Sequence, residues 1–207
     1  MPKRNAIKNY GEGEYYHCYN RGANKDPIFR DVEDYGYFLG LFKRHLSSEP
    51  ACDKQQRKYP HYADQVELIA YCLMTNHYHL LLHLKQQEGI ERLMRSVMTA
   101  YSAYYNRKYQ RSGVLFEGRF LASRIDSDAY LWHVSRYIHL NPLDMGEDPM
   151  RYEYSSIAYF RGDKYAEWLH PGVLVATNSE RQKYCDSVAS QQEYHRLRHA
   201  LLKQLAD

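Results

Sequence analysis

Residues 76–84, with the sequence NHYHLLLHL, constrain the fold of this chain more than any other segment. The segment alternates with the period of two that a β-strand requires, so His77 and His79 lie on one face and Tyr78 on the other. At roughly 3.3 Å of rise per residue the two histidines are about 7 Å apart, and their ring nitrogens can converge on one divalent cation. The simpler alternative is a half-buried strand with two exposed histidines, because histidine is often a surface residue.

The bulk composition predicts one domain, or one domain with a small appendage, since 207 residues with 44% apolar side chains are enough to build a core. Lys and Arg number 28 against 25 Asp and Glu, a mild excess that permits nucleic-acid binding without requiring it. Four scattered cysteines without a C-x-x-C pair argue against a thiolate metal site. The basic N-terminus lacks an apolar run, and the longest such run, 68–74, is too short to span a bilayer. We therefore expect a soluble, cytoplasmic protein without membrane contact.

Hydrophobic periodicity predicts strands and helices in the order β-α-β-β-α-β-α, which is typical of a ferredoxin-like α+β sandwich with an antiparallel sheet. Residues 47–65 are polar and contain prolines, so they predict an exposed loop. From about residue 148 the pattern changes to short helices, which indicates a first domain over 1–147 and a C-terminal helical extension over 148–207 that ends in a helix near 191–205. The expected strands are 14–20, 66–72, 77–84 and part of 114–125, and the expected helices are 31–46, 89–109 and 127–140.

The predicted helix over 127–140 carries the second informative pair of residues. Tyr137 and Asn141 are four residues apart, so their side chains stack on one face of the helix. A phenol beside an amide oxygen suits a nucleophile next to a third metal ligand. The cation would polarise a phosphodiester, and Tyr137 would attack phosphorus to give a phosphotyrosine. Oxygen ligands completed by water favour Mg²⁺ or Mn²⁺ over Zn²⁺. The alternative is a packing tyrosine, because aromatic residues are common in cores.

Several short motifs match a known family when they are taken in order. The H-Y-H strand is followed by the helical motif YIHLNP, with 58 residues from His79 to Tyr137. The other matching elements are YHCYNRG near the start, MTNHYHLLL, GVLFEGRF, and YSS at 154–156. Over roughly residues 10–160 the chain therefore resembles the HUH single-tyrosine transposases, and within them the REP-associated tyrosine transposases.

The resemblance implies an HUH nuclease core in which Tyr137 is the nucleophile. The implied ligands of the divalent metal, Mg²⁺ or Mn²⁺, are His77, His79 and Asn141. Family substrates are single-stranded DNA ends that carry hairpins, and cutting leaves a covalent 5′-phosphotyrosine and a free 3′-OH. Tyr78 is a departure, since the family usually has an aliphatic residue there, and it should change packing but leave ligation intact. The repeat-associated branch is expected to act as a monomer, so we expect a monomer rather than a homodimer.

A basic segment between residues 107 and 124 supports contact with DNA. Its cations outnumber one acid, Glu117, and aromatic residues are interleaved with them. Guanidinium groups on phosphates and aromatic rings on bases are how proteins hold single strands. A solvated charged face is the alternative. The predicted DNA-binding residues are Arg107, Lys108, Arg111, Arg119, Arg124, Phe116 and, from an earlier segment, Arg21.

Two other functions stay open on the sequence alone. A metal-dependent nuclease that activates water would also use H-x-H, but it usually needs Asp or Glu near the metal, and the strand contains neither. A non-catalytic nucleic-acid-binding module predicts loss of the histidines or of Tyr137, and all of them are present. A further possibility places the nucleophile on the helix over 89–109, where the weaker candidates are Tyr101, Tyr104 and Tyr105.

Overall fold

The computed structural model describes residues 10–190, and its centre is a four-stranded sheet. The strands are β1 (Glu14–Arg21), β2 (Val66–Met74), β3 (His77–Leu84) and β4 (Leu121–Ile125). They lie in the order β2-β3-β1-β4, and each neighbouring pair is antiparallel. The sheet is therefore the antiparallel one that the sequence predicts.

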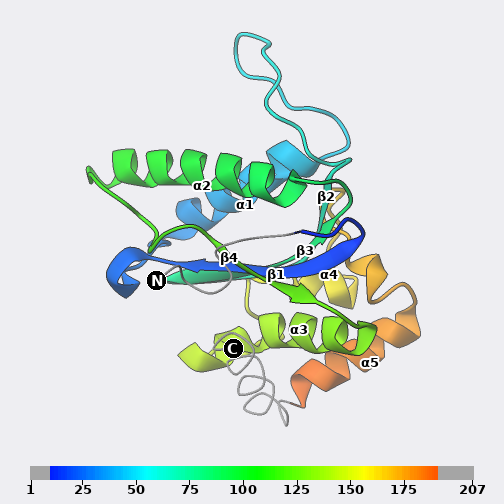
Figure 1. Cartoon of the computed structure of the whole chain (residues 1–207). Helices are drawn as coiled ribbons and strands as arrows, with labels where there is room; N and C mark the ends of the chain where they lie inside the picture. The colour runs from blue at the N-terminus through cyan, green and yellow to red at the C-terminus, as the bar shows by residue number, and fades with distance from the viewer. Residues whose placement is uncertain (1–9, 191–207) are drawn as a thin grey trace.

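Helices cover both faces of this sheet. The α-helices are α1 (Val32–Leu46), α2 (Gly89–Lys108), α3 (Asp128–Leu140), α4 (Ile157–Arg161) and α5 (Asn178–Ala189), and short 3-10 helices are η1 (Ala23–Lys25), η2 (Asn141–Met145) and η3 (Pro171–Val173). Helices α1 and α2 lie on one face, whereas α3 and α5 lie on the other (Figure 1). The chain order β1-α1-β2-β3-α2-β4-α3 confirms the predicted ferredoxin-like α+β sandwich.

Local sequence signals explain where these elements begin. The Asp31 side chain accepts a hydrogen bond from the backbone N–H of Asp34 at 3.1 Å, and the Ser127 side chain does the same for Tyr130 at 3.3 Å. Strand β2 continues to Met74, which pairs with His77, so the hairpin turn is shorter than predicted. The segment 47–65 contains no helix or strand apart from an isolated bridge, as predicted.

The end of α3 differs in one respect from the prediction. The helix does end at Leu140, but Asn141 keeps right-handed helical angles (φ −53°, ψ −34°) and begins η2, although a residue before proline usually avoids them. The Asn141 side chain stabilises this continuation, since its Nδ2 donates to the backbone oxygen of Tyr137 at 2.8 Å. The junction is therefore held by a hydrogen bond from the side chain at the end of the helix.

The face under α1 and α2 is an apolar core rich in aromatic residues. From β3 it receives Tyr78, Leu80 and Leu82, all fully buried. The hydroxyl of Tyr101 donates to the backbone oxygen of Ile28 at 2.5 Å, so this buried phenol is satisfied. Tyr105, and not Tyr104, is the fully buried member of the last turns of α2. The side chains that β3 sends to this face therefore serve packing.

The residues after 147 pack against α3 and β2 on the other face. The buried His139 of α3 lies between the hydroxyl of Tyr184 in α5 and that of Ser156, at 2.7 Å from each. The Ser156 hydroxyl also accepts from the backbone N–H of Tyr71 in β2 at 2.9 Å. The predicted domain boundary near 147 stays a prediction, and the helix expected near 191–205 lies outside the described residues. Within residues 10–190, no helix is both long and apolar enough to cross a membrane.

Candidate active site

The two histidines of the H-Y-H strand lie on the α3 face of the sheet, as the alternation predicts. Their ring centroids are 5.1 Å apart and the rings are nearly perpendicular, at 89°. His79 is 6% exposed and His77 is half-buried, while Tyr78 between them is buried on the opposite face. The strand thus presents both imidazoles to one small region beneath α3.

Helix α3 adds Tyr137 and Asn141 to the same region. The Tyr137 ring lies edge-on to His79 at 5.5 Å between centroids, and its side chain is 7% exposed. Asn141, one turn later, is bonded to the backbone of Tyr137 through Nδ2. Ring contacts therefore link His77, His79 and Tyr137, and a hydrogen bond links Asn141 to the backbone of Tyr137. The chemical roles of the four residues stay predictions.

Hydrogen bonds define which atoms of these side chains are available. His77 donates from Nδ1 to Oδ1 of Asn76 at 2.7 Å, and Asn76 Nδ2 in turn donates to the backbone oxygen of Lys25 at 3.1 Å. This chain of bonds fixes the Asn76 amide and leaves Nε2 of His77 with its lone pair. His79 is bonded through Nδ1 as well, at 2.9 Å from Nε2 of His17. Each histidine is thus oriented by a hydrogen bond at Nδ1, and its Nε2 is the nitrogen that remains to bind a metal ion.

Burial keeps the imidazoles neutral. Desolvation, together with the charge of Arg21, lowers the pKa of His77 to about 4, against the opposing charge of Asp144. Desolvation also lowers the pKa of His79 well below its usual value, with contributions from His17 and His77. Neutral imidazoles are the form that binds a metal ion, so at neutral pH no proton has to leave these two side chains first.

His17 is a site residue that the sequence prediction did not include. It is fully buried at the centre of β1, and its ring stacks on those of His79 and Tyr19 at 5.0 and 5.1 Å between centroids. The available signal was the alternation Tyr15, His17, Tyr19, which places three rings on one face of the first strand. These rings share a face with His77 and His79 only because of the register in which β1 pairs with β3. That register cannot be predicted from the sequence pattern.

Three of the six predicted DNA-binding cations form ion pairs within the described part of the protein. Lys108 lies 2.7 Å from Asp31 and 3.0 Å from the buried Asp34. Arg124 pairs with Glu14, and Arg21 pairs with Glu117 at 3.1 Å. These three cations stabilise the fold, and any role in DNA binding would have to share or break an existing ion pair.

The other predicted members of this surface differ in exposure. Phe116 is buried at 6% exposure and packs near Tyr78, so its ring is part of the core. Arg111 lies over the ring of Tyr105, with 5.5 Å to the ring centroid. Arg107 and Arg119 are both exposed and form no ion pair with any other residue of the described region. Of the predicted set, these two arginines are the most accessible to a phosphate.

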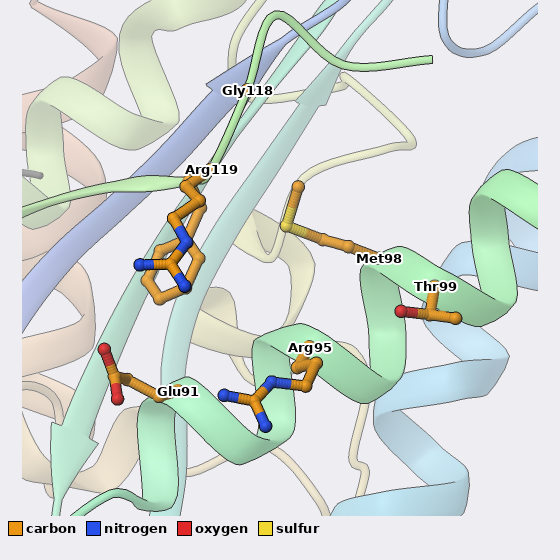
Figure 2. A pocket seen from close by; sticks show the side chains of 7 residues that line it. Glu91, Arg95, Met98, Thr99, Gly118 and Arg119 are labelled. Atoms are coloured by element: carbon orange, nitrogen blue, oxygen red, sulfur yellow. The ribbon is translucent and has the colours of Figure 1, made fainter. Parts of the chain in front are cut away.

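Arg119 lines a cavity of about 290 Å³ between α2 and the segment that leads into β4. Figure 2 shows Arg119 and Arg95 reaching into this space from the two sides, with Glu91 nearby on α2. Arg95 was not predicted, and it too is exposed and forms no ion pair within residues 10–190. Two unpaired guanidinium groups therefore converge on one cavity at the β4 edge of the sheet.

Comparison with known proteins relates this arrangement to a family. Residues 54–141 match the family model described as IS200-like transposase. A solved structure of a REP-associated tyrosine transposase bound to a REP hairpin matches with a TM-score of 0.55, covering 78% of this chain and 88% of that chain at 14% sequence identity. The predicted family resemblance is confirmed. At this identity the solved structure shows a common fold. No curated protein matches the chain.

The IS200-like segment 54–141 contains every residue predicted for the metal and the nucleophile. It spans β2, β3, α2, β4 and α3, and it therefore includes both elements that meet at the candidate site. His17 lies outside this segment, on β1, which inserts between β3 and β4. The strand that precedes the matched segment thus completes the wall of the site.

Proposed function

We propose that this chain is a DNA transposase that cleaves and rejoins single-stranded DNA through a covalent link to Tyr137. The observation that carries the proposal is the position of the Tyr137 ring, 5.5 Å from that of His79, inside a segment that matches IS200-like transposases. The solved REP-associated transposase of the same fold is bound to a REP hairpin, which supports hairpin-bearing DNA as the substrate class.

In the proposed reaction, the phenol oxygen of Tyr137 attacks the phosphorus of a phosphodiester. A bond forms between that oxygen and phosphorus, and the bond from phosphorus to the 3′-oxygen of the preceding nucleotide breaks. The phenol loses its proton and the departing 3′-oxygen gains one, leaving a 5′-phosphotyrosine and a free 3′-OH. Attack by a 3′-OH on the phosphotyrosine reverses these changes, restores Tyr137 and rejoins the strand.

The residues around Tyr137 fit a divalent cation. His77 and His79 are each oriented through Nδ1, which leaves Nε2 as the donor atom, and Asn141 uses its Nδ2 on the helix backbone, which leaves Oδ1. When bound, Mg²⁺ or Mn²⁺ would polarise the phosphodiester and offset the charge that develops on it. A set of two nitrogens and one oxygen, with positions left for water and phosphate, is suited to such ions.

A water-activating nuclease is the less well-supported function. Such a site would be expected to contain carboxylate ligands, and among residues 10–190 no group of three or more His, Cys, Asp or Glu side chains is placed to hold a metal. Tyr137, by contrast, lies within the ring cluster formed by His17 and His79. The geometry therefore favours a tyrosine nucleophile over a water molecule.

The DNA surface is proposed to include the cavity between Arg95 and Arg119. Their guanidinium groups would bind phosphates, and Glu91 beside them would accept a hydrogen bond from a base amino group. The cavity lies on the α2 side, whereas the histidines lie on the α3 side, and β4 is an edge strand. A strand that reaches both regions would pass around the β4 edge.

The direct test is incubation with single-stranded DNA that carries a hairpin, in Mg²⁺ or Mn²⁺, followed by a denaturing gel. We expect a protein–DNA adduct that survives denaturation, carries the DNA through a 5′-phosphate, and is absent with EDTA. The free 3′-OH of the other fragment should be extendable by a polymerase. Cleavage without any adduct would instead support the water-activating nuclease, and binding without cleavage would support the non-catalytic module.

A further inference from the structure

His17 makes a single hydrogen bond among the described residues, and that bond is to His79. The distance from His17 Nε2 to His79 Nδ1 is 2.9 Å. The two residues are diagonal neighbours on adjacent strands, because Tyr19 is the direct partner of His79 and His17 lies opposite Leu81. The contact therefore depends on the register of β1 against β3.

Packing alone does not account for an imidazole at this position. His17 is fully buried, and its Nδ1 has no hydrogen-bond partner among residues 10–190. A buried polar atom without a partner costs free energy, whereas an apolar ring of similar size would fill the same space without that cost. The His17 side chain thus makes one polar contact, to His79 of the candidate metal site. Its burial costs more free energy than that of an apolar ring of similar size would.

The contact has a defined consequence if His79 is a metal ligand. A ligating histidine offers the lone pair of one nitrogen and donates the N–H of the other to an acceptor that orients the ring. Nδ1 of His79 faces His17, so Nε2 is the atom that remains for a metal. His77 is arranged in the same way, with Nδ1 donating to the Asn76 amide oxygen. In this arrangement, each histidine of the H-Y-H strand is oriented by a hydrogen bond from its Nδ1–H.

We propose that His17 is a positioning residue whose Nε2 accepts the Nδ1–H of His79 and holds that ring with Nε2 toward the metal. This inference rests on the proposed function, because it assigns His79 a metal ion to bind. His17 itself touches neither the metal nor the DNA in this scheme. Loss of an outer-shell partner of this kind typically weakens metal binding by about 10- to 100-fold.

Two substitutions separate the hydrogen bond from the packing. His17→Phe keeps a planar ring against Tyr19 and His79 but removes the acceptor, whereas His17→Gln places an amide oxygen near the position of Nε2. The matched control is His83→Phe, since His83 lies on the same sheet face but bonds to Glu67 at 2.9 Å, away from the site. Thermal unfolding of each variant verifies that it is folded.

Electron paramagnetic resonance measures the affinity of the full chain for Mn²⁺ in the absence of DNA. A second assay measures adduct formation at a series of Mn²⁺ concentrations. We expect His17→Phe to bind Mn²⁺ about 10- to 100-fold more weakly and to recover adduct formation as Mn²⁺ is raised. His17→Gln should stay within a few-fold of the wild type, and His83→Phe should match it. Wild-type Mn²⁺ affinity in folded His17→Phe would overturn the inference while leaving the proposed function intact.

A second measurement on the wild type does not depend on the variants folding. Long-range ¹H–¹⁵N spectra of the Mg²⁺-loaded chain, with His79 assigned by comparison with His79→Ala, report which nitrogen carries the proton. We expect the Nδ1–H form for His79, and the Nε2–H form in the loaded protein would contradict the inference. If the wild type binds neither Mn²⁺ nor Mg²⁺ and forms no adduct, the proposed function itself fails and the role of His17 fails with it.

Discussion

Successive side chains of β3 serve the two faces of the sheet in different ways. Tyr78, Leu80 and Leu82 enter the apolar core beneath α1 and α2, where aromatic side chains fill space. On the opposite face, the His79 ring lies 5.1 Å from that of His77 and 5.5 Å from that of Tyr137 on α3, measured between ring centroids. The same strand therefore supplies packing on one side and potential ligands on the other.

The two faces differ in how their buried polar groups are paired. Two buried tyrosines on the α1/α2 face, Tyr101 and Tyr105, donate their hydroxyls to the backbone oxygens of Ile28 and Pro27. On the α3 face, His17 is buried with one nitrogen unpartnered in the described region, and desolvation lowers its pKa to about 3. Burying the His17 imidazole therefore costs free energy, and the proposed function gives a reason for that cost.

The largest expected effect is that of Tyr137→Phe, which should abolish cleavage and adduct formation. The substitution removes one oxygen and keeps the ring beside His79, so the unfolding free energy should change by about 1 kcal/mol or less. A denaturing gel measures the adduct and urea unfolding measures the stability. No concentration of Mn²⁺ should restore activity, because the nucleophile itself is missing.

The matched control is Tyr101→Phe, which removes a phenol oxygen from the opposite face. It should lose the hydrogen bond to Ile28, at about 1 kcal/mol, and keep adduct formation per folded molecule. Adduct formation by Tyr137→Phe would place the nucleophile elsewhere and would remove the chemical difference between the two faces.

The next effect in size is that of His77→Ala, which should prevent adduct formation at physiological Mg²⁺ through loss of metal binding. The side chain is half-buried and belongs to the first residue of β3, so the stability cost should be small. Raised Mn²⁺ should restore part of the activity, in contrast to Tyr137→Phe. Mn²⁺ titrations with and without DNA test this, and unaltered Mn²⁺ affinity would exclude His77 as a ligand.

The neighbouring substitution Tyr78→Ala should have the opposite profile. Removing a fully buried aromatic ring leaves a cavity in the α1/α2 core and should cost about 3–5 kcal/mol of unfolding free energy. The molecules that remain folded should bind Mn²⁺ with wild-type affinity, since the ring faces away from the histidines. A stable Tyr78→Ala variant with impaired metal binding would contradict the separation of the two faces.

Local periodicity explains what could be predicted from the sequence. The period of two assigned His77 and Tyr78 to opposite faces, and the four-residue spacing placed Asn141 one helical turn after Tyr137. The structure adds that the Asn141 amide donates to the backbone oxygen of Tyr137. These are relations within one element, which the backbone geometry dictates.

Relations between distant elements explain what was missed. His17 contacts His79 across 62 residues through the strand register, and Arg124 pairs with Glu14 across 110 residues. The basic segment therefore looked more available to DNA than it is, because its partners lie in other parts of the chain. Arg95 was not predicted because it is distant from Arg119 in the sequence. The two arginines line one cavity only because α2 passes the segment before β4.

Smaller effects are expected at the arginine cavity. The double substitution Arg95→Ala and Arg119→Ala should weaken binding of single-stranded DNA several-fold and lower the slope of log affinity against log salt by about 1 to 2. Fluorescence anisotropy at several salt concentrations measures both quantities. The control is Arg57→Ala, which removes a charge that is paired with Asp53 in the 47–65 loop. Equal losses in the variant and the control would mean that only net charge matters.

The smallest effect concerns His45, a buried histidine on the α1/α2 side of the molecule. Its Nδ1 donates to the backbone oxygen of Pro60 at 2.6 Å, and desolvation lowers its pKa although that hydrogen bond raises it. Above about pH 6.5 the group is neutral in the folded and unfolded states and adds no pH dependence. Below that value the unfolded chain takes up the proton first, so stability falls as the pH falls.

His45→Asn keeps a donor near the position of Nδ1 but does not titrate, so it should lose this part of the pH dependence. Urea unfolding at pH 7.5, 6.5 and 5.5 should show that the wild type loses more stability than the variant as the pH falls. The additional decrease in the folding equilibrium constant of the wild type should be less than about tenfold per pH unit. Mn²⁺ affinity and adduct formation at pH 7.5 should be unchanged. If His45→Asn impaired metal binding, a buried histidine far from the candidate site would also affect that site. His17 could then not be distinguished as a positioning residue from His45 as a purely structural one.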